Sequence, residues 1–128
     1  MSKQTILIVE DEKVLNDAYT TILKKEGYKV LSAYDGEEAL SIAETNHIDL
    51  ILLDLRMPKV NGIEFLKAYD LAGQDNPPIV IVFSNLDMQT EIDEAFSLGA
   101  TKYMLKAWAS PKELVKLVIK HVLTAMTY

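Results

Sequence analysis

Short runs of apolar, often β-branched residues alternate along the chain with longer segments in which apolar positions recur at helical spacing. This alternation predicts βαβ units, in which crossover helices join parallel strands of one sheet. The third and fourth runs are almost wholly apolar, which is typical of central strands covered on both faces. The predicted strands are Thr5 to Val9, Tyr28 to Ala33, Asp49 to Leu53, Ile79 to Phe83 and Lys102 to Leu105.

The first predicted helix has one apolar stripe, which we expect to pack against the sheet. The stripe comprises Val14, Leu15, Ala18, Tyr19, Ile22 and Leu23, and Gly27 follows as a left-handed stop. Later helices begin with a polar capping residue and a glutamate three positions further on, which together satisfy backbone NH groups. These pairs are Asp35 with Glu38, Asn61 with Glu64 and Ser110 with Glu113.

Acidic residues stand at the ends of two of these strands. Glu10 and Asp11 follow the first strand, and Asp54 follows the third. The carboxyl edge of a parallel sheet is where open α/β folds bind ligands, so we expect the three acids to share one site. Clustered carboxylates need a cation among them, and a ligand set made only of oxygens suits Mg²⁺. Lys106, after the fifth strand, is a candidate second positive charge.

Charge and composition exclude several function classes. The 128 residues carry 13 Lys and Arg against 19 Asp and Glu, a formal net charge of −6, which disfavours direct binding to nucleic acid. The absence of cysteine removes thiol catalysis and zinc–thiolate sites and fits a reducing compartment. No apolar run reaches the roughly 18 residues of a membrane span, and no secretion signal precedes the first strand. We therefore expect a soluble cytoplasmic protein that does not bind membranes.

Five motifs occur in one order along nearly the whole chain, each at the end of a predicted strand or in the loop that follows. They are Glu10-Asp11, Leu53-Asp54, Met57-Pro58-Lys59-Val60-Asn61-Gly62, Phe83-Ser84 and Tyr103-Met104-Leu105-Lys106. Together they resemble the receiver domain of two-component response regulators. The resemblance implies one receiver domain over residues 1–128 with a single-domain flavodoxin-like (βα)5 fold. Its five-stranded parallel sheet would have the order 2-1-3-4-5 with helices on both faces, which brings Asp11 and Asp54 together.

Phosphoryl transfer is the chemistry that this resemblance implies. Asp54 would be the nucleophile that accepts a phosphoryl group from a phosphohistidine of a sensor histidine kinase or a phosphotransfer protein. Lys106 and the Ser84 hydroxyl would each bind a phosphoryl oxygen. The groups that would hold Mg²⁺, together with waters, are Asp11, Asp54, the backbone carbonyl of Arg56, and Glu10 directly or through a water.

The resemblance also implies a switch. Phosphorylation would draw Ser84 and its loop inward, and Tyr103 would rotate into the vacated space. This changes the face made by the fourth helix, the fifth strand and the fifth helix, to which a downstream protein partner would bind. Homodimerisation on phosphorylation is left open. We expect only self-catalysed phosphoryl transfer and slow autodephosphorylation, and no enzymatic turnover of a separate substrate.

Two positions depart from the pattern of the family. Most receivers have a proline in a cis peptide after the active-site lysine, whereas this chain has Ala107. A cis bond before a residue other than proline costs roughly 2.5–4 kcal/mol, so we expect a trans peptide or a reshaped loop. The position after the switch hydroxyl, commonly small, is Asn85, which is expected to narrow access to the site. Arg56 and Leu86 are predicted to alter the approach of the hydrolytic water and so to set part of the phosphoryl lifetime.

Plainer interpretations exist for each of these residues. Acids in front of a helix, such as Glu10 and Asp11, stabilise its positive end whatever else they do. Ser84 and Lys106 taken singly are more often a loop hydroxyl and a solvated charge, and Tyr103 is more often a packed aromatic ring. The functional interpretation depends on their order and on their common place at strand ends.

Other functions stay open beside the receiver hypothesis. One is a degenerate receiver that binds partners without being phosphorylated. An aspartyl-phosphate phosphatase fits less well, because Arg56 stands where those enzymes have a second acid. A flavin or nucleotide carrier would need a Gly-, Ser- or Thr-rich loop after the first strand, where Glu10 to Glu12 would repel phosphate. No linker is visible before Tyr128, which favours a stand-alone protein, although an excised domain would look the same.

Overall fold

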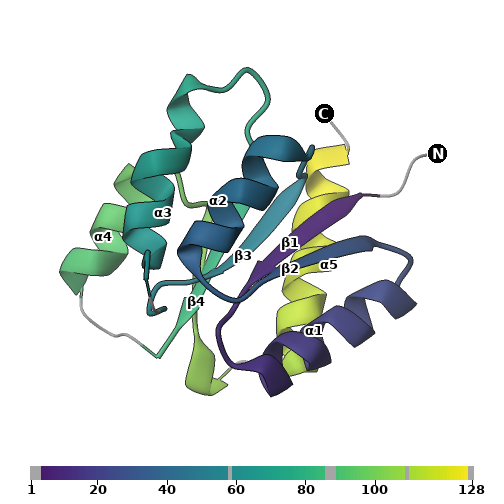
Figure 1. Cartoon of the computed structure of the whole chain (residues 1–128). Helices are drawn as coiled ribbons and strands as arrows, with labels where there is room; N and C mark the ends of the chain where they lie inside the picture. Colours follow the sequence, from purple (N-terminus) through teal and green to yellow (C-terminus); the bar gives the residue numbers. More distant parts are fainter. Residues whose placement is uncertain (1–3, 58, 86–88, 109, 127–128) are drawn as a thin grey trace.

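The computed structural model describes residues 4–57, 59–85, 89–108 and 110–126, and these contain one sheet of five parallel strands. The order across the sheet is β2-β1-β3-β4-β5, with β3 in the centre and β1 beside it (Figure 1). The strands are β1 (Thr5–Val9), β2 (Lys29–Ala33), β3 (Leu50–Asp54), β4 (Ile79–Ser84) and β5 (Lys102–Leu105). The predicted flavodoxin-like α/β fold is confirmed.

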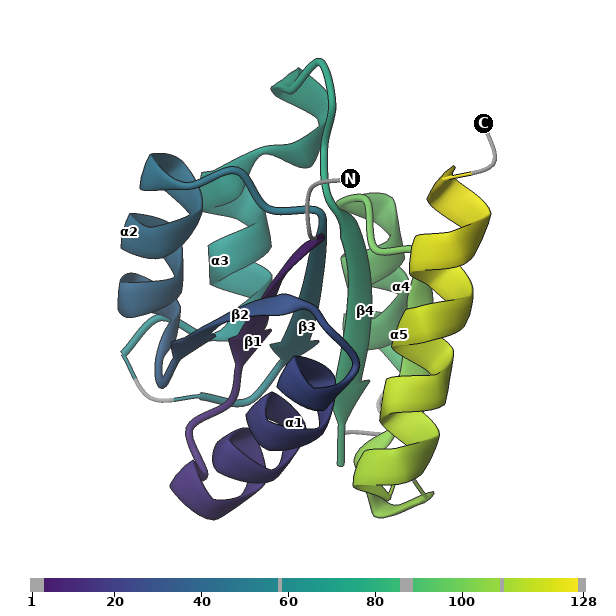
Figure 2. The same cartoon turned by 90° about the vertical axis from the view of Figure 1, so that its right-hand side faces the viewer.

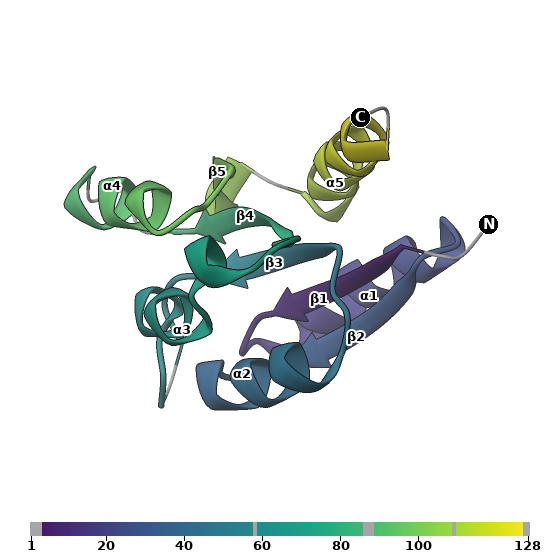
Figure 3. The same ribbon diagram turned by 90° about the horizontal axis from the view of Figure 1, so that it is seen from above.

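Helices cover both faces of this sheet. Helices α1 and α5 lie on one face, and α2, α3 and α4 lie on the other (Figure 2, Figure 3). None of the helices within the described ranges has the length and apolar character needed to cross a bilayer. The helices are α1 (Lys13–Lys25), α2 (Gly36–Thr45), α3 (Gly62–Tyr69), α4 (Gln89–Ser97) and α5 (Pro111–Met126), with 3₁₀ turns at Leu71–Gly73 and Lys106–Trp108.

The central strands are buried on both faces. Successive strand residues point to opposite sides of a sheet, so Leu7 and Val9 join the core with α2 and α3, whereas Ile6 and Ile8 join the core with α1 and α5. Every residue of β1 and β3 is buried, which explains why all but one residue of each strand is apolar. Strand β5 lies at the edge, and none of its residues is fully buried.

Several predicted boundaries are confirmed. The Asp35 side chain caps α2 by accepting a hydrogen bond of 2.8 Å from the Glu38 NH group. Asn61 and Glu64 form the expected reciprocal capping box at the start of α3, with bonds of 2.9 and 3.1 Å. Gly27 follows α1 with a φ of 95°, the left-handed conformation that glycine adopts at little cost.

Two strands end one residue later than predicted. Asp54 pairs with Phe83 across the sheet, and Ser84 pairs with Leu105, so both polar residues belong to strands. The sequence could not show this, because a polar side chain at the end of an apolar run looks like the first residue of a loop. The sheet therefore holds the backbone of both candidate site residues.

The predicted stripe of the first helix is wrong at one position. Val14 is 84% exposed, while Asn16, a polar residue outside the predicted stripe, is fully buried. Two residues along an α-helix correspond to a rotation of about 200°, so Val14 points away from the sheet when Asn16 faces it. The buried side of α1 is centred on Asn16, Tyr19 and Leu23.

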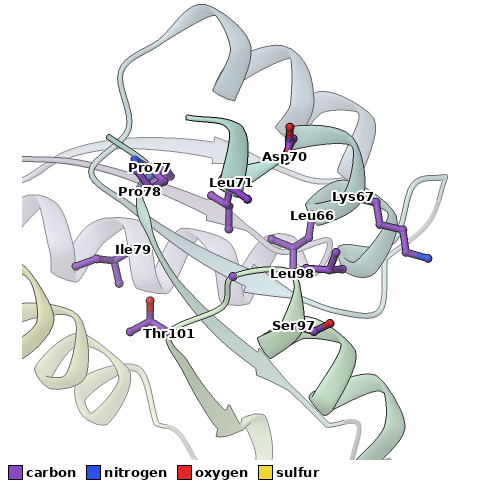
Figure 4. Close-up of a pocket in the computed structure, with 12 residues that line it drawn as sticks. Leu66, Lys67, Asp70, Leu71, Pro77, Pro78, Ile79, Ser97, Leu98 and Thr101 are labelled. Atoms are coloured by element: carbon purple, nitrogen blue, oxygen red, sulfur yellow. The ribbon is translucent and has the colours of Figure 1, made fainter. Parts of the chain in front are cut away.

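A cavity of about 450 Å³ lies near the amino ends of strands β4 and β5. Its walls are largely apolar, and Leu66, Leu71 and Leu98 lie around it in Figure 4. This cavity is therefore remote from the acidic residues, which follow the carboxyl ends of β1 and β3.

Candidate functional site

Three acids lie together at the carboxyl edge of the sheet. Glu10 and Asp11 follow β1, and Asp54 ends the neighbouring strand β3. Each offers a carboxylate oxygen, and these oxygens lie within 4.8 Å of one another. Glu10 is fully buried and Asp54 is 3% exposed, whereas Asp11 is exposed. The acids that the sequence singled out thus form one cluster between β1 and β3.

Glu10 is held through both its backbone and its side chain. Its NH group donates a 3.1 Å hydrogen bond to the carbonyl of Ala33, the last residue of β2. Its Oε2 accepts a 2.9 Å bond from the NH group of Glu12, and its Oε1 lies 2.5 Å from the ammonium of Lys106. The carboxylate is therefore fixed at the entrance to α1.

Asp54 is fixed by two further contacts beyond its place in the sheet. Its Oδ1 accepts a 3.0 Å hydrogen bond from the NH group of Arg56, two residues further along the chain. Its Oδ2 accepts a 3.0 Å bond from the Lys106 ammonium. Both carboxylate oxygens thus have a defined direction in a buried environment.

Lys106 is the cation of the cluster. Its ammonium contacts Glu10 and Asp54, lies 3.4 Å from Glu12, and sits 5.7 Å from the centre of the Phe83 ring. Only 9% of its side chain is exposed. The residue lies at the start of the 3₁₀ turn that follows β5, so a group from the edge strand reaches the acids of the central strands.

The peptide before Ala107 is trans, as expected from the absence of proline at this position. The described residues contain no cis peptide, so the bond between Lys106 and Ala107 is trans. The chain forms a 3₁₀ turn there, from Lys106 to Trp108. The side chain of Trp108 lies outside what the structure describes.

Burial and the charges of neighbouring acids raise the pKa values of Glu10 and Asp54. Burial is the main cause that raises the pKa of Glu10 to about 7, with hydrogen bonds from Lys106 and Glu12 acting against it and the charge of Asp54 adding to it. The pKa of Asp54 is also raised, again mainly by burial, against the hydrogen bonds from Arg56 and Lys106. Burial would lower the pKa of Lys106, but its bonds to Glu10 and Asp54 outweigh that effect and raise it.

The residues present fit a magnesium ion. The cluster offers only oxygen donors, and the single charge of Lys106 leaves the pKa values of two buried carboxyls raised. A divalent cation would favour the ionised carboxylates further, and Mg²⁺ prefers a few carboxylates completed by waters. Glu10, Asp11 and Asp54 could therefore hold this ion together.

Ser84 and Tyr103 belong to β4 and β5, the two strands that follow β3 in the order of the sheet. Ser84 ends β4 and is 1% exposed, and Tyr103 in β5 is half-buried. The Tyr103 hydroxyl donates a 3.5 Å hydrogen bond to the carbonyl of Ser84. The two residues predicted to form the switch are thus in contact, with the tyrosine ring directed inward and packed against the core.

A small cavity of about 190 Å³ lies directly over Asp54. It is lined by residues at the carboxyl ends of β3 and β4 and in the turns that follow β1, β3, β4 and β5: Asp11, Glu12, Asp54, Arg56, Ser84, Asn85 and Lys106. Asn85 and Arg56 thus line this cavity, and their control of access to it stays a prediction. Leu86, the other residue predicted to act there, lies outside the described residues.

Two residues at this site were missed from the sequence. Glu12 adds a third carboxylate beside Lys106, and Asn16 donates side-chain hydrogen bonds to the backbone of Glu10 and Ala33. The available signal for Asn16 was a polar residue between apolar positions of the first helix. No local signal exists for the contact of Glu12 with Lys106, because 94 positions separate the two residues.

Known proteins resemble this chain in sequence. The response regulator SaeR of Staphylococcus aureus is 39% identical over 121 residues, which are 94% of this chain and 51% of SaeR. The chain therefore spans about half the length of this relative. The model of the response regulator receiver domain family matches residues 6–119.

Solved structures agree with this result. A CheY-like response regulator receiver domain protein from Methanospirillum hungatei has a TM-score of 0.89 and 25% identity, with 98% of each chain covered. The response regulator protein TrrA from Thermotoga maritima, solved in complex with Mg²⁺ and BeF, has a TM-score of 0.76 and 27% identity over 91% of this chain and 97% of TrrA. Fold, site and sequence place this chain in the family of response regulator receiver domains, which are signalling domains.

Proposed function

We propose that this chain, as one receiver domain over residues 1–128, accepts a phosphoryl group on Asp54 in a reaction that depends on Mg²⁺. The observation that carries the proposal is the buried Asp54 carboxylate at the base of a small cavity, bonded to Lys106 and adjoining two further acids. In the reaction, a carboxylate oxygen of Asp54 forms a bond to phosphorus while the bond from phosphorus to the leaving nitrogen of a phosphohistidine breaks. The electron pair of that bond stays on the imidazole.

The chain's own groups prepare Asp54 for this step. The Arg56 NH group and the Lys106 ammonium bind its two oxygens and keep the carboxylate in one orientation. In phosphoryl transfer such positioning and electrostatics supply nearly all of the catalysis. As the phosphoryl group arrives, Lys106 donates to one of its oxygens, and the Ser84 hydroxyl donates to another.

The metal would be held by Glu10, Asp11, Asp54 and the backbone carbonyl of Arg56. When bound, Mg²⁺ supplies positive charge against the phosphoryl oxygens, which the single charge of Lys106 does not balance. Asn85, Arg56 and Leu86 would control the access of water to the acyl phosphate and so its lifetime.

The donor would be a sensor histidine kinase or a phosphotransfer protein. The output would be a changed surface over α4, β5 and α5, with Tyr103 as the residue that responds to Ser84. Support for this part comes from the contact between the Tyr103 hydroxyl and the Ser84 carbonyl, which joins the site to the edge strand. A downstream protein would bind the phosphorylated surface, and dimerisation is one form that this binding can take.

Intact mass spectrometry tests the phosphoacceptor. The protein is incubated with Mg²⁺ and acetyl phosphate, beside Asp54→Asn and beside wild type in a chelator. We expect one phosphoryl group on the wild type with Mg²⁺ and none in the other two samples. Equal modification of Asp54→Asn would contradict the proposed nucleophile. If neither acetyl phosphate nor a histidine kinase modifies the wild type, the chain is a binding module that works without phosphorylation.

A further inference from the structure

Asn16 is a polar residue in a fully buried position of α1. Its side chain lies four residues into the helix, on the side that faces the sheet, and none of it is exposed. The chain passes from the end of β1 into α1 through a short turn that contains Glu10 and Asp11 (Figure 2). Buried amides are retained at little cost only where their hydrogen bonds are made.

The amide of Asn16 donates two hydrogen bonds at the ends of two strands and accepts one within its own helix. Its Nδ2 donates to the carbonyl of Glu10 at 3.0 Å and to the carbonyl of Ala33 at 3.2 Å. Its Oδ1 accepts a 3.2 Å bond from the hydroxyl of Thr20, one turn further along the helix. The Thr20 hydroxyl lies 3.1 Å from that of Ser32 in β2. Asn16 thus ties α1 to the carboxyl ends of β1 and β2.

The bond to the Glu10 carbonyl bears directly on the acidic cluster. That carbonyl belongs to the peptide group that joins Glu10 to Asp11, two of the three acids of the cluster. The pairing of β1 with β3 ends at Val9, so the ladder between these strands does not extend to this peptide. Because a peptide group is planar, fixing its carbonyl also fixes the direction of the Asp11 NH group and of both Cα atoms.

We propose that Asn16 is a positioning residue for the metal site: its amide orients the peptide between Glu10 and Asp11, and so aligns both carboxylates for a divalent cation. Asn16 does not touch the ion. The inference rests on the proposed function, since it assigns a role within the same site. Groups that orient metal ligands in this way typically change metal affinity by roughly 10–100-fold when they are removed.

Isothermal titration calorimetry with MgCl₂ tests the inference on three variants. Asn16→Leu places an apolar side chain of similar size in the buried position and removes both donated hydrogen bonds. Thr20→Val removes the hydroxyl that binds Asn16 Oδ1 and leaves the amide donors in place. Leu23→Ala destabilises α1 about two turns beyond Asn16, and controls for a general loss of stability. Thermal unfolding of each variant shows that it is folded at the temperature of the titration.

We expect the dissociation constant for Mg²⁺ to rise roughly tenfold or more in Asn16→Leu, and to change far less in Thr20→Val and Leu23→Ala. Hydrogen exchange in a chelator gives a second measurement without metal, in which the Asp11 amide should exchange faster in Asn16→Leu than in Leu23→Ala. If Asn16→Leu does not fold, Asn16→Ser takes its place with the same expectation.

Two negative results have different meanings. Wild-type affinity in a folded Asn16→Leu protein, with unchanged exchange at Asp11, would overturn the role of Asn16 and leave the proposed function standing. A wild-type protein that binds no Mg²⁺ would overturn the proposed function and this inference with it.

Discussion

The acids and the lysine of the site are carried by strands of very different burial. Strands β1 and β3, which lead into Glu10 and Asp54, are buried along their whole length. Strand β5, which leads into Lys106, lies at the edge of the sheet and is exposed or half-buried throughout. Segments with few buried contacts open at lower free energy than the core. The proposed nucleophile Asp54 is therefore on the rigid part of the molecule, and Lys106, which binds it, follows a strand that opens at lower free energy.

Tyr103, the predicted switch residue, also belongs to the less buried part of the molecule. It lies in β5, three residues before Lys106, and its hydroxyl reaches back to the carbonyl of Ser84. If Asp54 is phosphorylated as proposed, the structural response should therefore be smaller in the buried strands β1 and β3 than in the edge strand β5. This contrast is expected of a switch in which the residues after β1 and β3 keep their positions while those in and after β5 change conformation.

The largest predicted effect compares a fully buried residue of β3 with a partly buried residue of β5. Leu52→Ala in β3 should lower the free energy of unfolding by about 3 kcal/mol, because the side chain is fully buried. Met104→Ala in β5 should cost about 1 kcal/mol, since Met104 is only partly buried. Urea denaturation measures both values. Equal losses of unfolding free energy in the two variants would contradict the proposed difference in stability between β3 and β5.

A smaller effect concerns the buried charge on the rigid half. Burial raises the pKa of Glu10 from 4.5 to about 7, so its contribution to stability is complete below pH 4.5 and is lost as the pH rises through 7. Glu10→Gln removes this dependence. Without metal, the variant should be more stable than the wild type by about 2 kcal/mol at pH 8 and similar to it near pH 5. Urea unfolding in a chelator at several pH values checks this, and parallel curves for the two proteins would contradict it.

The smallest effect lies at Tyr19 of α1, which packs against strand β4. Its ring packs edge to face against Phe83 at 5.4 Å, and its buried hydroxyl has no hydrogen-bond partner among the described residues. Tyr19→Phe keeps the ring contact and should stabilise the protein by about 1 kcal/mol. Thermal and urea unfolding measure the gain, with Tyr34→Phe as a control that should stay near zero. A loss of stability in Tyr19→Phe would show that the hydroxyl has a favourable contact.

The central part of the fold could be predicted from sequence because its signals are local. An apolar run followed by acids located β1 and β3, and the motifs placed Lys106 and Ser84 beside them. The contacts of α1 were harder, because helical spacing alone does not show which side of the stripe faces the sheet. For that reason the sequence did not show that Asn16 is buried and Val14 is exposed. The pairing of Glu12 with Lys106 depends on the finished topology, so nothing near either residue could have predicted it.

Gly36, the first residue of α2, has a consequence for how the loop after Asp54 can respond. Even a methyl group at this glycine would collide with the carbonyl of Val60 in that loop, so the two backbones are in direct contact. The loop consequently cannot be pushed toward α2 without displacing the helix as well. Any strain that phosphorylation places on this loop in that direction would spread to a second element on the same face, far from the α4 and β5 surface.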